Sequence, residues 1–163
     1  GYDILLKSLF LLKEKKLNFV CDIYGNGSKK KEILNIIKIN NLLNQVKVKG
    51  VKKNIFSLYK KYDLFVLSSK FEGFPNSLLE ALSTGLPCIS SDCDYGPNEI
   101  IKNNINGLLF KNSNHLDLYK KKKYLIVNRD KLKLYSYNAK KEFNYSIFNE
   151  DKIHKWEKLL KKK

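Results

Sequence analysis

The sequence predicts an α/β fold built on a doubly wound parallel sheet. Two observations carry this prediction: short apolar runs that end in turn residues, and amphipathic stretches of helical period between them. Strands that alternate with helices in this way form parallel sheets joined by right-handed crossovers. The length of 163 residues and a hydrophobic fraction of 43% suit one domain with a core of its own.

The elements of the first half follow from these patterns. An apolar face at helical spacing (Leu5, Leu9, Leu12) predicts the first helix. Asn54 is a good capping residue for the third helix. The expected elements are helices over residues 2–16, 29–40 and 55–62 and strands over residues 18–24, 46–50 and 64–69.

The second half continues the alternation. A helix that follows Pro75 is expected to end near Thr84, because Gly85 and Pro87 interrupt the apolar pattern. A later helical region is expected to break near Asn128. The remaining expected elements are strands over 87–91 and 108–110, a short helix within 92–101, two helical pieces over 116–141 and an amphipathic helix over 146–160.

The stretch from Glu72 to Glu80 joins the expected central strand to the helix after it. Ligands of open α/β sheets bind where strands end and loops lead into helices. Gly73 lets the backbone approach a ligand closely. Pro75 suits the first helical position because it has no N–H to lose. We therefore expect the ligand site here.

The start of this helix is a candidate anion site. Asn76 and Ser77 are good capping residues, and the free N–H groups of a first turn can hold a phosphate. Glu72 would lie on the loop side, and Glu80 roughly 5 Å inside the helix. A ligand with phosphates here could present hydroxyl groups to both carboxylates. The residues alone leave two alternatives open. Glu72 could be a surface residue and Glu80 a helix-start residue whose negative charge interacts favourably with the helix dipole. The two carboxylates could instead flank a glycosidic bond, as in a glycosidase.

A glycine-rich turn, Gly25-Asn26-Gly27, follows the expected strand over 18–24. The turn lacks the last glycine of a dinucleotide-binding loop, since Lys30 occupies that place. It is either a structural turn or a loop that lines a ligand. A nicotinamide cofactor is not expected.

The net charge of +16 has three interpretations: a solvated basic surface, attraction to an anionic membrane leaflet, or nucleic-acid binding. Lysines occur along the whole chain, with clusters at 29–31, 120–123 and 161–163, and no nucleic-acid motif is evident. We therefore expect no nucleic acid as partner. No apolar run approaches the length of about 20 residues that a membrane span needs.

The chain has three cysteines, Cys21, Cys88 and Cys93, without a Cys-x-x-Cys pair. Buried thiols in a reducing cytoplasm are the simplest interpretation of this odd number. Because no histidine cluster accompanies them, no zinc site is expected.

Residues Phe65 to Ala81 closely resemble the donor-binding motif of family-four retaining glycosyltransferases, which have the two-domain GT-B fold. The family signature is a glutamate, seven residues and a second glutamate, which Glu72 and Glu80 match. The similarity covers roughly Gly1 to Phe110 and the tail loosely. Its other segments are 1–6, Ile23-Tyr24-Gly25-Asn26-Gly27, Gly85-Leu86-Pro87, Gly96-Pro97-Asn98-Glu99-Ile100 and Asn106-Gly107-Leu108-Leu109-Phe110.

The resemblance implies that residues 1–163 form one Rossmann-like, nucleotide-sugar-binding domain, the C-terminal half of a GT-B enzyme. Glu72 would be the catalytic-site residue that contacts hydroxyl groups of the donor sugar, and Glu80 would bind the ribose. The N–H groups of Ser77 and Leu78 would hold the diphosphate, and residues 48–51 would lie by the base. The implied donor-binding residues are Gly25, Gly27, Val48, Gly50, Val51, Gly73, Phe74, Pro75, Asn76, Ser77, Leu78 and Glu80.

In this family the leaving diphosphate is thought to help deprotonate the acceptor on the same face of the sugar, so that configuration is retained. Neither a metal nor another cofactor is expected. In this family the Arg and Lys that pair with the diphosphate usually lie upstream of the segment that matches Gly1-Tyr2-Asp3, and the resemblance implies that the N-terminal acceptor domain is not part of this chain. We therefore expect weak donor binding and no transfer by the chain alone.

The stretch from Asp92 to Pro97 resembles enzymes that build bacterial polysaccharides or lipid-linked glycans. The resemblance implies a UDP-hexose or UDP-N-acetylhexosamine donor and a saccharide or lipid-linked acceptor. It also implies a cytoplasmic enzyme, with peripheral contact at the inner face of the membrane as a further expectation. The alternatives are a nucleotide-sugar epimerase or phosphorylase of the same fold, and a non-enzymatic basic binding module.

Overall fold

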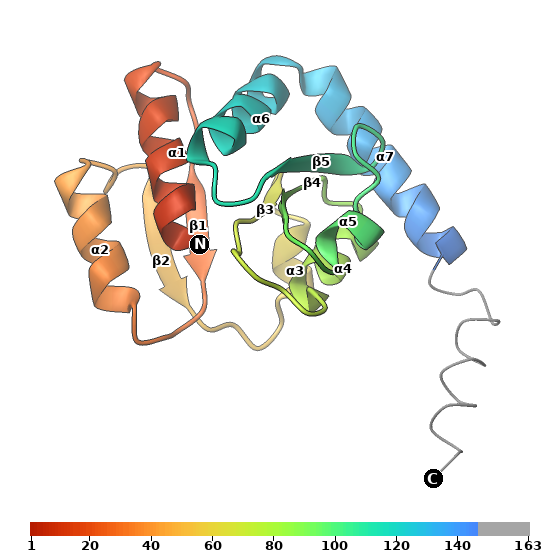
Figure 1. Cartoon of the computed structure of the whole chain (residues 1–163), viewed down its shortest axis with the longest axis horizontal. Coiled ribbons are helices and arrows are strands. Elements are labelled where there is room, and N and C mark those ends of the chain that lie inside the picture. The colour runs from red at the N-terminus through yellow and green to blue at the C-terminus, as the bar shows by residue number, and fades with distance from the viewer. Residues whose placement is uncertain (147–163) are drawn as a thin grey trace, which may run out of the picture.

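The computed structural model describes residues 1–146, with side chains through residue 141. Strands and helices alternate along the chain, which confirms the predicted α/β class (Figure 1). The helices are α1 (Tyr2–Glu14), α2 (Lys30–Ile39), α3 (Phe56–Tyr59), α4 (Asn76–Ser83), α5 (Pro97–Ile100), α6 (His115–Val127) and α7 (Arg129–Ser146). The strands are β1 (Cys21–Tyr24), β2 (Val46–Gly50), β3 (Phe65–Leu67), β4 (Cys88–Asp92) and β5 (Gly107–Lys111).

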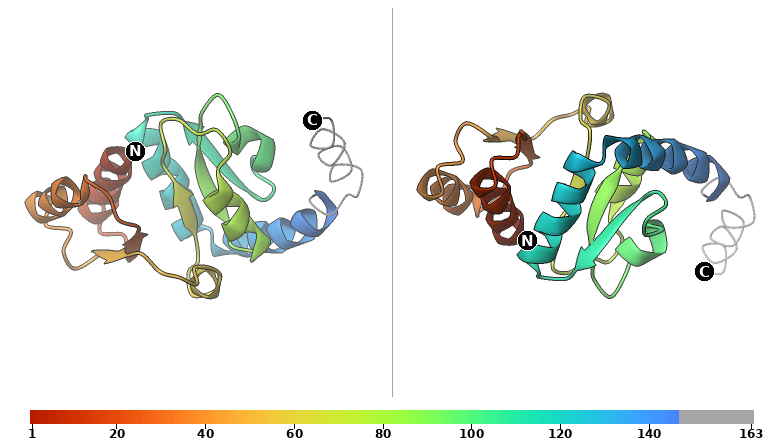
Figure 2. Two further views of the ribbon diagram at one scale, coloured as in Figure 1. Left: turned by 90° about the horizontal axis from the view of Figure 1, so that it is seen from below. Right: turned by 90° about the horizontal axis from the view of Figure 1, so that it is seen from above.

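The described strands pair in parallel and form two sheets. β1 pairs with β2, with Cys21 opposite Val46. β4 lies between β3 and β5, with Cys88 opposite both Phe65 and Gly107. Figure 2 shows the β1–β2 pair apart from the three-stranded sheet. The expected single sheet is therefore divided between β1 and β3, which have no hydrogen-bonded pairing with each other in the described part of the chain.

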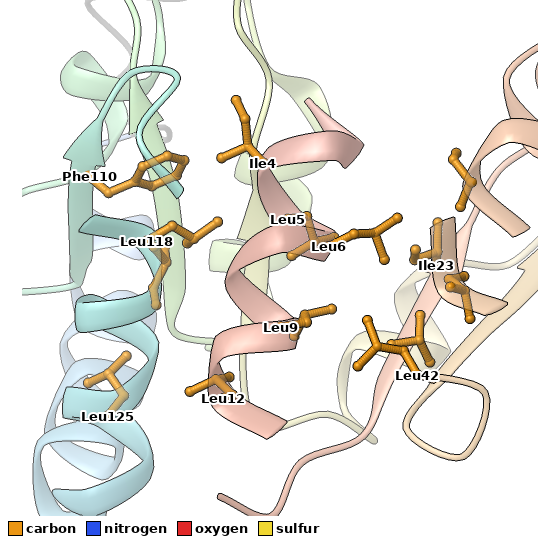
Figure 3. Close-up of a cluster of buried hydrophobic side chains, with 14 of the residues drawn as sticks. Ile4, Leu5, Leu6, Leu9, Leu12, Ile23, Leu42, Phe110, Leu118 and Leu125 are labelled. Carbon is orange, nitrogen blue, oxygen red and sulfur yellow. The ribbon is translucent and has the colours of Figure 1, made fainter. Parts of the chain in front are cut away.

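Helix α1 is the centre of the larger core cluster. Figure 3 shows Leu118 and Leu125 of α6 on one side of α1 and Ile23 of β1 on the other. Leu6 and Leu12 of α1 are each only 1% exposed. A fully buried leucine contributes about 1.5–3 kcal/mol relative to an exposed one, so this helix holds the two sheets together.

A second core cluster packs α4 against α7. Ala81 of α4 and Ala139 of α7 are both buried in it, together with Cys88 of β4. The next residue of β4, Ile89, belongs to the larger cluster around α1. Because successive strand residues point to opposite faces, the β3–β4–β5 sheet is covered on both faces. This is the doubly wound arrangement that the sequence predicts.

Several boundaries differ from the expected ones. β1 begins at Cys21 rather than residue 18, because its partner β2 begins only at Val46 and residues before Cys21 have no strand to pair with. α3 and β3 are shorter than expected. The break at Asn128 is confirmed, since α6 ends at Val127 and α7 begins at Arg129. Apart from Ser146, the helix expected over 146–160 lies outside the described residues.

One lysine of the 120–123 cluster is in the core rather than on a solvated surface. Lys122 is 3% exposed, and its Nζ donates to Ser8 Oγ at 2.7 Å. The Ser8 hydroxyl donates in turn to the Leu5 carbonyl at 2.6 Å. The inner face of an amphipathic helix is expected to be apolar, so a lysine there is an exception. The helical spacing of α6 places Lys122 toward α1.

Candidate functional site

The residues expected to bind a ligand lie where strands end. Gly50 is the last residue of β2, and Gly25 follows β1 directly. The Gly25 N–H donates to the Gly50 carbonyl at 3.0 Å, so these two strand ends are held together. Gly27 follows in the same loop as Gly25. Val48 lies within β2, and Val51 directly follows that strand. Glu72 and the residues after it lie in the loop that follows β3. The candidate site therefore spans the carboxyl ends of β1, β2 and β3.

The loop after Glu72 rests on a second loop that follows β4. Gly96 has φ 88° and ψ −66°. A Cβ added to Gly96 would come within 2.6 Å of Pro75 Cδ and 2.9 Å of the Gly73 carbonyl oxygen. Gly73 itself faces open space, with no heavy atom within 4 Å of an added Cβ. Pro75 is buried and Phe74 is exposed, so one side of the loop is anchored and the other is free for a ligand.

Helix α4 begins one residue later than expected. Pro75 precedes it as the capping residue, and neither Asn76 nor Ser77 caps the helix through its side chain. The Asn76 N–H donates to the Phe74 carbonyl and the Leu78 N–H to the Pro75 carbonyl, each at 3.0 Å. The Ser77 N–H has no backbone partner within the described residues. Of the two N–H groups expected to hold a diphosphate, that of Leu78 is already bonded and that of Ser77 remains available to a phosphate.

Glu80 lies near the middle of α4 and is held by a tyrosine from α3. The Tyr59 hydroxyl donates to Glu80 Oε2 at 3.2 Å. Tyr59 is buried and its ring packs edge-on against Phe65 of β3, with ring centroids 5.9 Å apart. Burial, and then the Glu80 carboxylate, raise the pKa of Tyr59, so the phenol remains a donor over the neutral range. Oε1 of Glu80 has no hydrogen-bond partner in the described part of the chain and can accept from a ligand.

Sequence reasoning missed Tyr59 as a site residue. Tyr59 falls in the expected helix over 55–62, but nothing in its local pattern indicates that it reaches Glu80, which lies 21 positions further along the chain. The spacing of the aromatic residues Phe56, Tyr59 and Tyr62 predicts only that one face of this helix is packed. The contact depends on how α3 packs on α4.

A lysine and an aspartate fix the other side of the Glu72 loop. Lys70 Nζ lies 3.1 Å from Asp3 Oδ2 at the start of α1. The Lys70 carbonyl accepts from Asn112 Nδ2 at 2.8 Å. These contacts tie the end of β3 to α1 and to the loop after β5, so Glu72 follows a positioned segment.

A groove of about 1120 Å³ lies on another part of the surface. It runs between α3, the turn that leads to β4, and α7, and its lining includes Tyr62, Gly85 and Tyr137. Glu72, Gly73 and Ser77 do not line it. This groove therefore does not include the Glu72 loop or the start of α4.

Within residues 1–146 no group of His, Cys, Asp and Glu side chains could hold a metal ion. Cys21, Cys88 and Cys93 are free thiols. None of the helices in the described part is long and apolar enough to cross a bilayer.

The parallel sheets, the loop on Gly96 and the two glutamates around the start of α4 describe an α/β domain whose candidate ligand site lies at strand ends. The family model of glycosyl transferases group 1 matches residues 1–142. The chain belongs to this family, and the predicted resemblance to GT-B glycosyltransferases is confirmed.

Individual relatives agree with the family. A glycosyltransferase of Methanocaldococcus jannaschii is 42% identical over 101 residues, which are 62% of this chain and 25% of that protein. The poly(ribitol-phosphate) α-N-acetylglucosaminyltransferase of Staphylococcus aureus is 29% identical over 97% of this chain and 32% of its own length. A crystal structure of S. aureus TarM with fondaparinux, α-GlcNAc-glycerol and UDP matches 97% of this chain and 32% of its own, at 29% identity and a TM-score of 0.86. This chain therefore spans about a quarter to a third of these relatives.

Proposed function

We propose that this chain is the donor-binding domain of a retaining glycosyltransferase that uses a UDP-sugar. The observation that carries the proposal is the placement of Glu72 and Glu80 on either side of the α4 start, in a chain of the group 1 family. A UDP-N-acetylhexosamine is the first donor to test, because the S. aureus relative is an N-acetylglucosaminyltransferase and the TarM structure contains UDP. A UDP-hexose is the second.

In the proposed complex the diphosphate lies at the start of α4, where the Ser77 N–H and the helix dipole favour negative charge. Oε1 of Glu80 accepts from a ribose hydroxyl, and Tyr59 keeps the carboxylate oriented through Oε2. Glu72 contacts hydroxyl groups of the sugar. The backbone of Gly73 and its neighbours lines the sugar pocket, since nothing occupies the space beside Gly73.

The proposed reaction breaks the bond from the anomeric carbon to the diphosphate oxygen and forms a bond from that carbon to the acceptor oxygen on the same face. The acceptor hydroxyl transfers its proton to the leaving diphosphate, whose growing charge the α4 start stabilises. The acceptor is a saccharide or a lipid-linked glycan. The charge of +16 would favour peripheral contact with an anionic cytoplasmic leaflet, where a lipid-linked acceptor lies.

Replacing Glu80 by alanine is expected to weaken UDP binding about 10-fold or more, because a hydrogen bond to a charged group contributes roughly 1.5–3 kcal/mol. Isothermal titration of the chain with UDP, GDP, ADP and UDP-N-acetylglucosamine measures this and the preference among nucleotides. Glu14→Ala, at the exposed end of α1, is the matched control and should leave the Kd unchanged. Equal UDP affinity in folded Glu80→Ala and native chain would refute the assignment of the ribose site.

Tyr59→Phe is expected to weaken UDP binding about 3- to 10-fold, since it removes one donor to Glu80 worth roughly 1 kcal/mol and keeps the buried ring. The same titration measures the change. Tyr137→Phe removes a phenol that is 65% exposed on α7 and serves as the control. A UDP affinity unchanged by Tyr59→Phe would mean that Tyr59 only packs against Phe65 and does not position Glu80.

A further inference from the structure

The groove between α3, the turn that leads to β4, and α7 is called the α3–α7 groove below. Asp63 and Pro87, which line it, come just before β3 and β4. The groove is therefore at the amino ends of these strands, whereas the Glu72 loop follows the carboxyl end of β3. Its volume of about 1120 Å³ exceeds the roughly 300–1,000 Å³ of a pocket for a small ligand, so it can hold several linked units of a polymer.

The walls of the α3–α7 groove are positively charged. Lys60 comes directly after α3, and Lys133 and Lys140 belong to α7. All three are exposed, and none has a carboxylate partner within the described residues. The one acidic residue among the described lining residues, Asp63, lies 3.8 Å from Arg129 Nη1. The three ammonium groups are therefore available to an anionic ligand.

Charge alone does not distinguish this groove, because lysines occur along the whole chain. The groove adds exposed aromatic side chains on two of its walls, Phe56 on α3 (49% exposed) and Tyr137 on α7 (65% exposed). The Phe56 ring packs edge-on against Tyr59, with ring centroids 6.2 Å apart. Exposed aromatic rings offer apolar surface that a ligand can cover, and the C–H faces of sugar rings pack on such surface.

The hydroxyl groups in the lining favour a ligand that donates hydrogen bonds. Three of them already donate to backbone carbonyls at 2.7–2.8 Å, those of Ser83, Thr84 and Ser136. A hydroxyl oxygen whose proton is engaged keeps its lone pairs for accepting. Sugar rings carry several hydroxyl donors, whereas the phosphodiester backbone of a nucleic acid carries none.

We infer that the α3–α7 groove binds an anionic saccharide polymer, which is a chain of sugar units that bear phosphate, sulfate or carboxylate groups. Its sugar rings cover Phe56 and Tyr137, its hydroxyl groups donate to the hydroxyl oxygens of the lining, and its anions pair with the three lysines. A flat bilayer surface would not reach side chains that line a concave groove.

This inference rests on the proposed function, because the polymer is taken to be a distal part of the saccharide acceptor. β3 and β4 have three and five residues. At 3.3 Å per residue the two ends of these strands are roughly 10–17 Å apart, so a polymer of several units held in the groove can extend to the donor edge. Binding at a second place raises the effective concentration of the acceptor near the donor without any contact to the reacting atoms.

Isothermal titration of the chain with a short dextran sulfate tests the charges of the groove. Replacing the three groove lysines by glutamine (K60Q, K133Q, K140Q) should weaken binding about 10-fold or more, because three ion pairs are lost. The matched control removes the same charge from exposed lysines outside the groove and should change the Kd less than about 2-fold. The control positions are Lys15, Lys120 and Lys123. An equal loss in both variants would overturn the inference, since the net charge alone would then explain binding.

Tyr137→Ala tests the saccharide part of the ligand. It should weaken the binding of dextran sulfate about 5-fold and leave the binding of inorganic polyphosphate unchanged, because polyphosphate has no sugar ring to pack on Tyr137. Leu134→Ala, at an exposed position of α7 outside the groove, is the matched control and should change neither. A Tyr137→Ala chain that binds dextran sulfate as tightly as the Leu134→Ala chain would overturn the saccharide assignment.

A single-stranded oligothymidylate and phosphatidylglycerol vesicles separate the other anionic partners. Each should lose no more affinity in the groove variant than in the control variant, and a selective loss for either would overturn the choice of a saccharide. All these variants keep Tyr59, Glu72 and Glu80, so UDP should bind to them as to the native chain. A native chain that fails to bind UDP would count against the proposed donor site, whereas the dextran sulfate comparison would still decide the groove.

Discussion

Replacing Gly96 by alanine is expected to lower the free energy of unfolding by about 3 kcal/mol or more. At φ 88° and ψ −66° the backbone of Gly96 is in a region that an L-residue rarely adopts, which costs on the order of 1–3 kcal/mol. The added Cβ would also meet Pro75 Cδ at 2.6 Å and the Gly73 carbonyl at 2.9 Å. Overpacking of a fixed contact costs roughly 1–3 kcal/mol more. Urea unfolding followed by circular dichroism measures the loss.

The control for this substitution is Gly27→Ala. Gly27 has no heavy atom within 4 Å of an added Cβ, and its φ is not positive. The Gly27→Ala substitution should change the free energy of unfolding of the chain by less than about 1 kcal/mol. Because Gly96 supports the Gly73–Pro75 loop, Gly96→Ala should also weaken UDP binding in the fraction that remains folded. A Gly96→Ala chain as stable as the Gly27→Ala chain would contradict the contact between the two loops.

Most helices and strands can be predicted from local sequence patterns, because these elements depend largely on residues close together in the chain. The apolar spacing of α1 and the break at Asn128 depend on residues close together in the chain, and both agree with the structure. The lengths of β1 and β3 were not predictable in this way. A strand ends where its partner ends, and the partner of β1 lies more than 20 residues away.

The candidate site shows the same limit. The Glu72–Glu80 spacing is local, so the sequence predicts a helix start with a glutamate on each side. The support from Gly96 and Tyr59 is not local: each reaches the motif from a different loop or helix. Gly96 is visible in the sequence only as part of a family resemblance. Its physical role, a close approach to Pro75, requires the packed loops.

Lys122 gives the second large expected effect, a stability that rises with pH. Burial between α1 and α6 disfavours the ammonium ion and lowers the pKa of Lys122 from 10.5 to about 7, although the nearby Cys21 thiolate would favour the charge. In the unfolded chain the lysine stays protonated up to about pH 10. Between these values the unfolded state binds more protons than the folded state. The free energy of unfolding therefore increases as pH rises above 7, by up to roughly 1 kcal/mol per pH unit.

The rise should end near pH 9, because the Cys21 thiol then acts in the opposite direction. Burial raises the pKa of Cys21 from 9.0 to about 11, so above pH 9 the unfolded state loses a proton that the folded state keeps. Stability falls with pH wherever the unfolded state binds fewer protons. Urea unfolding at half-unit steps from pH 6.5 to 9 isolates the window in which Lys122 dominates.

Lys122→Met tests the cause of this slope, because it keeps the length of the buried side chain and removes the charge. We expect the variant to be more stable than the native chain near pH 7, by about 1–3 kcal/mol, and to lose most of the rise up to pH 9. Lys123→Met, at the exposed neighbouring position of α6, should leave the slope intact. A native chain with a flat profile would show that Lys122 stays charged in the folded core. A Lys122→Met chain with the same rise would show that other groups cause the slope.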